Sequence, residues 1–179
     1  MNIYNIWRNE MILIKYTSIF FVFIVTFLIG YLISKKYSNR VMELKEIQMF
    51  LDILENKIKF TYEPLKEIFL QMNNLVKGNI GNLVHEIENK LENDNAEIAW
   101  KKSIKNSRNN LEQEDIQILE NLFKMLGKTD KEGQVSQIEL AQTFITTQIK
   151  KAEKNEEKNA KLYKTLGATV GLALVIILI

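Results

Sequence analysis

Residues able to carry out chemistry are few and scattered in this sequence. Cysteine is absent and His85 is the only histidine, which excludes thiolate chemistry and metal sites that need several of these ligands. Gly127–Asp130 reads GKTD, like the end of a phosphate-binding loop, but the glycine required five residues earlier is missing. Acidic pairs such as Glu112 and Glu114 have no glycine turn or apolar enclosure and are typical of helix surfaces or helix starts. The sequence therefore predicts a protein that is not an enzyme and holds no cofactor or metal.

The charge balance excludes a nucleic-acid-binding module. The chain has 179 residues, with 24 Lys and Arg against 22 Asp and Glu. Two of these basic residues and one acidic residue lie outside residues 35–164, so the middle of the chain is nearly neutral. No field of one sign is available there to neutralise phosphates.

The first apolar run has the length of a membrane span. Residues 16–33 contain 18 residues and no charge, and a helix of that length covers about 27 Å of the ~30 Å hydrocarbon layer. The run exceeds the ~7–15 apolar residues of a signal peptide, and no small-residue cleavage pattern follows it. We expect an uncleaved transmembrane helix at 16–33 after a short leader at 1–15, in which Met11 is a second candidate start.

The second apolar run, residues 165–179, ends at the last residue given. Fifteen residues is short for a span, and runs of this length also occur as buried core helices. All sides of this segment are apolar, however, which favours a second transmembrane helix at 165–179. Gly167 and Gly171 have the spacing that lets two helices approach closely, and the simplest partner is the first span.

Basic residues next to the two runs predict the orientation. The first run is followed by Lys35, Lys36 and Arg40, whereas only Arg8 and Lys15 precede it. Because basic flanks stay on the cytosolic side, we expect residues 34–164 in the cytosol and both termini across the membrane. The second run is preceded by Lys150, Lys151, Lys154, Lys158, Lys161 and Lys164.

Apolar residues in the middle recur at helical spacing, and no strand pattern competes. Pro64 is placed to begin a helix, Gly78 to break one, and Gly127 to end one in the left-handed conformation. Asn79 and Asn95 are placed to cap helices. The sequence predicts an all-α fold: a helical bundle of about six helices between an N-terminal and a C-terminal transmembrane helix. The first and last helices are expected to be long and continuous with the membrane spans.

Three motifs resemble the stage III sporulation protein AB family. Glu63-Pro64-Leu65 is similar to the family's turn after the first long helix, Ala99-Trp100 with Ser103 to its AW..S helix, and Leu126–Gln134 to its LGxxDxxGQ stretch. The resemblance covers residues 11–179, including Lys164–Gly167 before the apolar tail. The family residues, serving in structure or in partner binding, are Pro64, Leu65, Trp100, Gly127, Thr129, Asp130, Gly133 and Gln134.

The residues of the third motif also have a simple local interpretation. Gly127 stops a helix, Thr129 or Asp130 caps the next one, and Gly133 gives room for close packing beside the fifth helix. Contact with a partner protein is the alternative interpretation.

The resemblance implies a function that periodicity does not. It implies a sporulation-specific membrane platform or scaffold of the mother cell–forespore channel complex, located in the mother-cell membrane facing the forespore. Platform proteins of type II secretion and type IV pilus machines have similar cytosolic domains and contact a cytosolic ATPase. The implied partners are the sporulation ATPase (stage III sporulation protein AA), other membrane proteins of the complex and membrane lipid, and a homo-oligomer stays open.

A different class of protein is the alternative. It is a small two-span membrane sensor or regulatory protein whose helical bundle binds a ligand or a partner.

Overall fold

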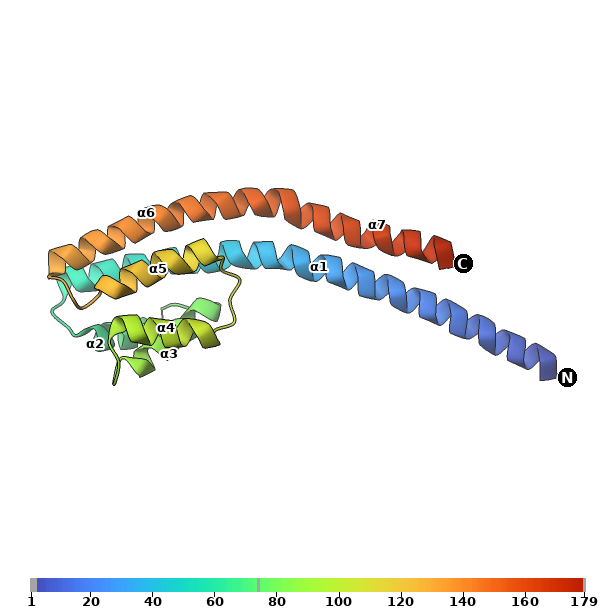
Figure 1. Ribbon diagram of the computed structural model, residues 1–179, viewed down its shortest axis with the longest axis horizontal. Coiled ribbons are helices and arrows are strands. Elements are labelled where there is room, and N and C mark those ends of the chain that lie inside the picture. Colours follow the sequence, from blue (N-terminus) through green and yellow to red (C-terminus); the bar gives the residue numbers. More distant parts are fainter. Residues whose placement is uncertain (1–2, 74, 179) are drawn as a thin grey trace. The chain divides into compact units, whose positions relative to one another are not determined.

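Every regular element in the described part of the chain is a helix, as predicted. The computed structural model describes residues 3–73 and 75–178, with side chains from Met11 onward apart from Ile12 (Figure 1). The predicted all-α bundle with long, apolar first and last helices is confirmed. The elements in chain order are α1 (Ile3–Phe60), α2 (Leu65–Met72), α3 (Gly78–Lys90), α4 (Ala96–Asn106), α5 (Gln113–Met125), α6 (Lys131–Asn155), the π-helical segment η1 (Glu156–Ala160) and α7 (Lys161–Leu178).

The chain divides into two compact units. The apolar unit consists of residues 3–38 and 155–178, and the bundle unit of residues 39–154. Helix α1 contributes to both units. The predicted leader at 1–15 falls largely on residues whose side chains lie outside the described part, including Trp7 and Arg8.

The bundle unit is built around an antiparallel pair formed by α1 and α6. Gln142 on α6 donates to Asp52 on α1 over 2.8 Å, and Gln48 on α1 donates to Thr146 on α6 over 3.4 Å. Both helices carry one apolar seam at steps of three or four residues, which places that seam on one face. The buried seam residues are Leu44, Ile47, Leu51, Leu54 and Ile58 on α1, and Ile138, Ala141, Ile145, Ile149 and Ala152 on α6.

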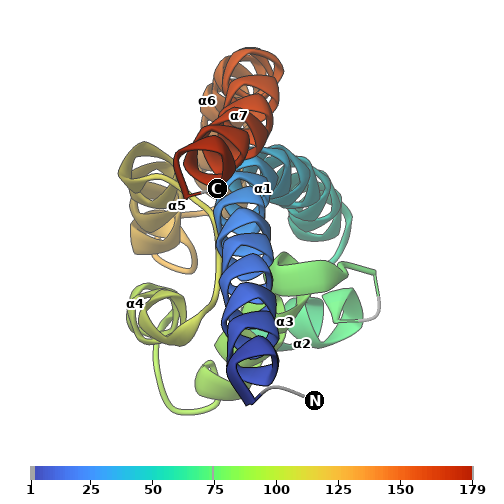
Figure 2. The same ribbon diagram turned by 90° about the vertical axis from the view of Figure 1, so that its right-hand side faces the viewer.

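Aromatic rings occupy the centre of this core. The ring of Trp100 stacks on that of Phe123 with centroids 4.8 Å apart, and Phe50 meets Phe69 edge-on at 5.7 Å. Helices α1, α2, α4 and α5 supply these rings, and Figure 2 shows α5 lying beside α1 and α6. Burial of such large apolar surfaces is what holds the short helices on the long pair.

Several helix ends fall where the local pattern predicts them. Asn95 caps α4 through its side-chain oxygen, which accepts from the backbone N–H of Ile98 over 3.0 Å. Gly127 has φ of +75° directly after α5, the left-handed conformation in which a residue with a side chain would be strained. Pro64 immediately precedes α2, one position earlier than predicted.

Two local predictions are wrong. Helix α2 ends at Met72, so Gly78 does not break it, and Gly78 instead begins α3 with a positive φ. Asn79 does not cap α3, because its side chain donates to the buried carboxylate of Glu43 over 2.7 Å. The last long helix runs without a break through α6, η1 and α7, as predicted, and η1 adds a wider π-helical turn to it.

The two terminal helices meet the length and composition of membrane spans. One 18-residue window in each is apolar enough to cross a bilayer, and only 11% of each window is buried. Large side chains such as Phe20, Phe21, Ile176 and Ile177 are therefore exposed. Exposed apolar helices of this kind are consistent with membrane localisation.

Candidate functional site

The turn between α5 and α6 contains most of the residues singled out by the LGxxDxxGQ resemblance. The Gln134 side chain bridges this turn: its oxygen accepts from the N–H of Gly127 over 3.0 Å, and its amide donates to the carbonyl of Thr129 over 3.0 Å. Asp130 caps α6, accepting from the N–H of Gly133 over 2.9 Å. The Thr129 hydroxyl is buried and has no hydrogen-bond partner within the described residues. Of the two cap candidates, the structure selects Asp130.

Gly133 leaves space for the cap of α6. A β-carbon built on Gly133 would lie 2.7 Å from Oδ1 of Asp130 and 3.1 Å from Cβ of Thr129. Close packing of Gly133 beside the fifth helix stays a prediction. Gly127 faces α2, with its β-position 3.2 Å from Cδ1 of Leu65.

These contacts bring the first and third motifs together around a hollow that we name the turn cavity. It has a volume of about 300 Å³ and lies between the α1–α2 loop and the α5–α6 turn. Tyr62 on its rim is 94% exposed, and the Lys131 ammonium lies 4.6 Å from the centre of the Tyr62 ring. Phe60, next to the rim, is 73% exposed. The lining residues are Ile58, Thr61, Tyr62, Glu63, Leu65, Ile68, Gly127, Lys131 and Gln134.

Trp100, the residue of the second motif, does not line the turn cavity. It is 2% exposed and packs in the core against Phe123. An ion pair links its helix, α4, to the α5–α6 turn, because Lys128 of the turn lies 2.7 Å from the carboxylate of Glu97 on α4. Lys101, also on α4, lies 3.0 Å from the same carboxylate. Hydrogen bonds from these two lysines lower the pKa of Glu97 to about 2.

Gly167 and Gly171 both face α1 in the apolar unit. A β-carbon on Gly167 would lie 3.0 Å from Cα of Gly30, and one on Gly171 would lie 2.7 Å from Oγ1 of Thr26. A β-carbon on Gly30 would lie 2.6 Å from the carbonyl oxygen of Tyr163. Gly30 therefore lies where α1 and α7 approach each other closely. The sequence analysis did not select Gly30, although it is the single glycine of the first apolar run.

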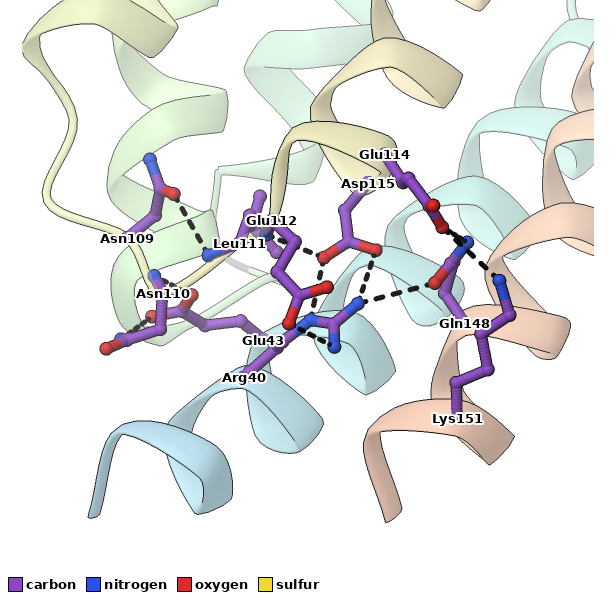
Figure 3. A network of polar contacts seen from close by, with 10 residues as sticks. All are labelled: Arg40, Glu43, Asn109, Asn110, Leu111, Glu112, Glu114, Asp115, Gln148 and Lys151. Atoms are coloured by element: carbon purple, nitrogen blue, oxygen red, sulfur yellow. Dashed lines mark hydrogen bonds and ion pairs between the residues drawn. The ribbon is translucent and has the colours of Figure 1, made fainter. Parts of the chain in front are cut away.

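A buried polar network at the other end of the bundle unit was also missed (Figure 3). Arg40 on α1 is 5% exposed and donates to both carboxylate oxygens of Asp115 on α5, over 2.9 and 3.0 Å. It also lies 2.8 Å from Glu112 and donates to Gln148 on α6 over 3.3 Å. Asp115 additionally accepts from the N–H of Glu112 over 2.8 Å, which fixes the start of α5.

A buried carboxylate of α1, that of Glu43, holds the loop before α5. Glu43 is fully buried and accepts from the backbone N–H and the side-chain amide of Asn110, over 2.6 and 2.8 Å. Glu43 and Arg40 together fix the α4–α5 connection on α1, as Figure 3 shows. Paired, hydrogen-bonded charges are the form in which buried charges are tolerated.

The spacing of the apolar residues indicates two members of this network, because charged residues stand at positions that continue the apolar seams. Arg40 lies four residues before Leu44 and so extends the α1 seam by one step, and Asp115 does the same before Leu119 on α5. A charged residue at a seam position is buried and needs a partner of opposite charge. The sequence analysis counted Arg40 as a membrane-flanking charge, whereas it is an internal ion-pair partner.

Metal-binding side chains do not cluster in the described residues. These residues contain no group of three or more His, Cys, Asp or Glu side chains placed to hold a metal ion. His85 lies on the surface beside Glu88, 3.7 Å away, with 61% of its side chain exposed.

Comparison with known proteins identifies the family. The family model described as stage III sporulation protein AB matches residues 15–179. Stage III sporulation protein AB of Bacillus subtilis (strain 168) is 26% identical over 170 residues, which cover 93% of this chain and 99% of that protein. A solved structure of a stage III sporulation protein AB has the same fold, with a TM-score of 0.61 and 22% identity over 67% of this chain and 98% of that one. An all-helical chain with two long apolar helices, matched over nearly its whole length, thus belongs to the stage III sporulation protein AB family.

Proposed function

We propose that this protein is a membrane-anchored scaffold of the mother cell–forespore channel complex that docks a secretion-type ATPase. Its family supports a role in sporulation. The proposed spans are residues 16–33 and 165–179, with residues 34–164 in the cytosol. The basic flanks support this topology, since lysine and arginine accumulate on the cytosolic side of membrane helices.

The turn cavity is the observation that carries the docking proposal. The chain enters and leaves the bundle unit at residues 39 and 154, which lie at the same end of the antiparallel pair. The turn cavity lies at the opposite end of the bundle unit, where α1 ends and α6 begins. A docking surface at that end stays clear of the segments that lead to the proposed spans.

The chemistry of the turn cavity suits a protein contact. Its floor is apolar, formed by Ile58, Leu65 and Ile68, and its rim carries Tyr62 and Lys131. Exposed aromatic rings beside a small apolar hollow are typical of the residues that dominate binding energy in protein interfaces. Partner docking explains why Tyr62 and Phe60 are exposed on the surface of a well-packed bundle.

Recovery of the ATPase with the full-length protein tests this proposal. The protein is purified in detergent from sporulating cells, and bound stage III sporulation protein AA is quantified. A Tyr62→Ser, Lys131→Ala variant is expected to lose the ATPase while keeping its melting temperature. Leu75→Ser is the matched control, because Leu75 is also exposed but lies away from the turn cavity.

Two results would contradict the docking proposal. One is full recovery of the ATPase with the double variant, and the other is an equal loss with Leu75→Ser. A small molecule retained through purification of the wild-type protein would favour the sensor alternative.

A further inference from the structure

A second hollow of the bundle unit is a groove between α5 and α6, whose lining residues, from Gln113 to Gln148, all lie outside the family motifs. This α5–α6 groove has a volume of about 530 Å³. Leu122 and Ala141 form its buried floor, and Leu140 and Phe144 stand on its α6 wall with 48% and 49% of their surfaces exposed. An apolar hollow with half-exposed side chains on its wall is an unfilled packing site.

The rim of the groove is made of side-chain amides. Gln113, Gln117 and Asn121 follow one another at four-residue steps along α5, and Gln137 and Gln148 lie on α6. The Gln117 amide donates to Asn121 over 3.3 Å, so the row is partly ordered before anything binds. Each amide carries both donors and an acceptor.

No free charge lines the groove among the residues that the structure describes. Glu114 is its one charged residue, and Glu114 accepts from Gln148 over 2.9 Å and lies 3.3 Å from Lys151. Hydrogen bonds from Gln148 and Lys151 lower the pKa of Glu114. The Glu114 carboxylate therefore stays ionised and paired at neutral pH. A charged partner segment would lose its hydration here without gaining an ion pair.

We propose that the α5–α6 groove is a self-association face, occupied by the same groove of a second copy of this chain. A surface pairs with itself about a two-fold axis when it is its own complement. This one meets that condition in two ways. Amides pair with amides because each donates and accepts, and Leu140 and Phe144 supply the projecting side chains while Leu122 and Ala141 supply the hollow that receives them.

The buried network holds the two walls of the groove at a fixed spacing. Gln148 belongs to the groove lining and also accepts from Arg40, which in turn holds Asp115 at the start of α5. Both walls are therefore tied to α1 before association. A preformed face loses less conformational freedom when it binds.

The absence of cysteine in the chain allows a direct test by crosslinking. Single variants Gln117→Cys and Asn121→Cys are introduced into the full-length protein in detergent and treated with a short bismaleimide. Both are expected to yield crosslinked dimers at protein concentrations where Ile98→Cys, exposed on α4, stays monomeric. Absence of the dimer band from both groove variants overturns the proposal.

A second measurement keeps the test independent of crosslinking geometry. Phe144→Glu places a charge in the neutral groove and is expected to raise the dimer dissociation constant by about ten-fold or more in sedimentation velocity. Leu70→Glu, with the same exposure of 49% on α2, is the matched control and leaves the constant unchanged. Equal constants for wild type and Phe144→Glu overturn the proposal.

Occupation by another protein would also be recognised. If wild type is monomeric and Phe144→Glu, but not Leu70→Glu, loses a co-purifying protein, the groove serves that protein and self-association is wrong. The proposal does not rest on ATPase docking, which is read out separately with the Tyr62→Ser, Lys131→Ala variant.

Discussion

Arg40 and Asp115 form a two-point ion pair although 75 positions separate them in the chain. Nε of Arg40 lies 2.9 Å from Oδ2 of Asp115, and Nη2 lies 3.0 Å from Oδ1. The Asp115 side chain is fully buried and that of Arg40 nearly so. The pair joins α1 to the first turn of α5, and Gln148 extends the connection to α6.

Removal of one partner should leave a buried charge without compensation. We expect Arg40→Ala to lower the free energy of unfolding by about 3–5 kcal/mol, measured by urea unfolding of the full chain in detergent. The free energy of unfolding of Arg40→Lys should lie between those of the wild type and Arg40→Ala, because an ammonium group keeps the charge but cannot reproduce the two-point geometry. Lys45→Ala is the control: its ion pair with Glu153 is about half exposed, and its loss should cost at most about 1 kcal/mol. Similar effects of Arg40→Ala and Lys45→Ala would contradict this account.

The helix cap at the α5–α6 turn gives a smaller effect. Asp130→Ala should lower the free energy of unfolding by about 1 kcal/mol, since the N–H of Gly133 loses its acceptor. We expect ATPase recovery to stay unchanged. Thr129→Ala should destabilise less, because the Thr129 hydroxyl has no partner to lose. Lost ATPase binding at an unchanged melting temperature would show that Asp130 belongs to the interface.

Close contact at Gly30 should govern the pairing of the two helices in the apolar unit. Tyr37 and Tyr163 stack with ring centroids 6.0 Å apart, so a Tyr37→Cys, Tyr163→Cys variant should be joined internally by a short bismaleimide. Adding Gly30→Val should slow that reaction, because its β-carbon would lie 2.6 Å from the Tyr163 carbonyl. Thr169→Val, on the exposed side of α7, should leave the rate unchanged. Equal rates in all three backgrounds would exclude a steric role for Gly30.

Glu46 should make the stability of the bundle unit depend on pH. Burial raises the pKa of the Glu46 carboxyl, and the charge of Glu43 raises it further, against a hydrogen bond from the backbone of Ile80. One carboxylate oxygen is buried without a hydrogen-bond partner among the described residues. Because the folded state binds this proton more tightly than the unfolded chain, stability falls as pH rises from the ordinary carboxyl range through the raised pKa.

Glu46→Gln tests that pH dependence. The variant should be at least as stable as wild type at neutral pH, with a flatter stability profile between the ordinary carboxyl pKa and neutrality. The matched control is Glu67→Gln, since Glu67 is an exposed carboxylate on α2. A Glu46→Gln profile that parallels wild type would show that Glu46 does not titrate in this range.

Short-range patterns predicted the helices and several of their ends, whereas contacts between distant segments escaped prediction. The Asn95 cap and the left-handed Gly127 depend on neighbours within three or four positions, which a sequence displays directly. The partner of Arg40 depends on how α5 docks on α1, which no local pattern specifies. Asn79 illustrates the competition: a suitable cap residue served Glu43 instead, because a buried carboxylate needs its donors more than an exposed helix end does.

The sequence predicted several residues of the candidate site but not the cavity that they form. The resemblance selected Leu65, Gly127 and Gln134, which meet at the turn cavity, but it also selected Trp100, which lies in the core. Tyr62 and Lys131, on the rim, were not selected, since neither belongs to a pattern of spacing. The α5–α6 groove was missed for the same reason: amides on two helices become a surface only once those helices are side by side.

The stacking of Trp100 on Phe123 provides the bundle unit with an intrinsic optical reporter. The chain contains two tryptophans, and the other, Trp7, precedes the first apolar run. Replacing Trp7 by Phe would leave an indole sealed from solvent as the sole emitter, so its fluorescence would shift to longer wavelength only when the bundle core admits water. Loosening of the bundle unit could then be followed in vesicles of the purified protein without any attached dye.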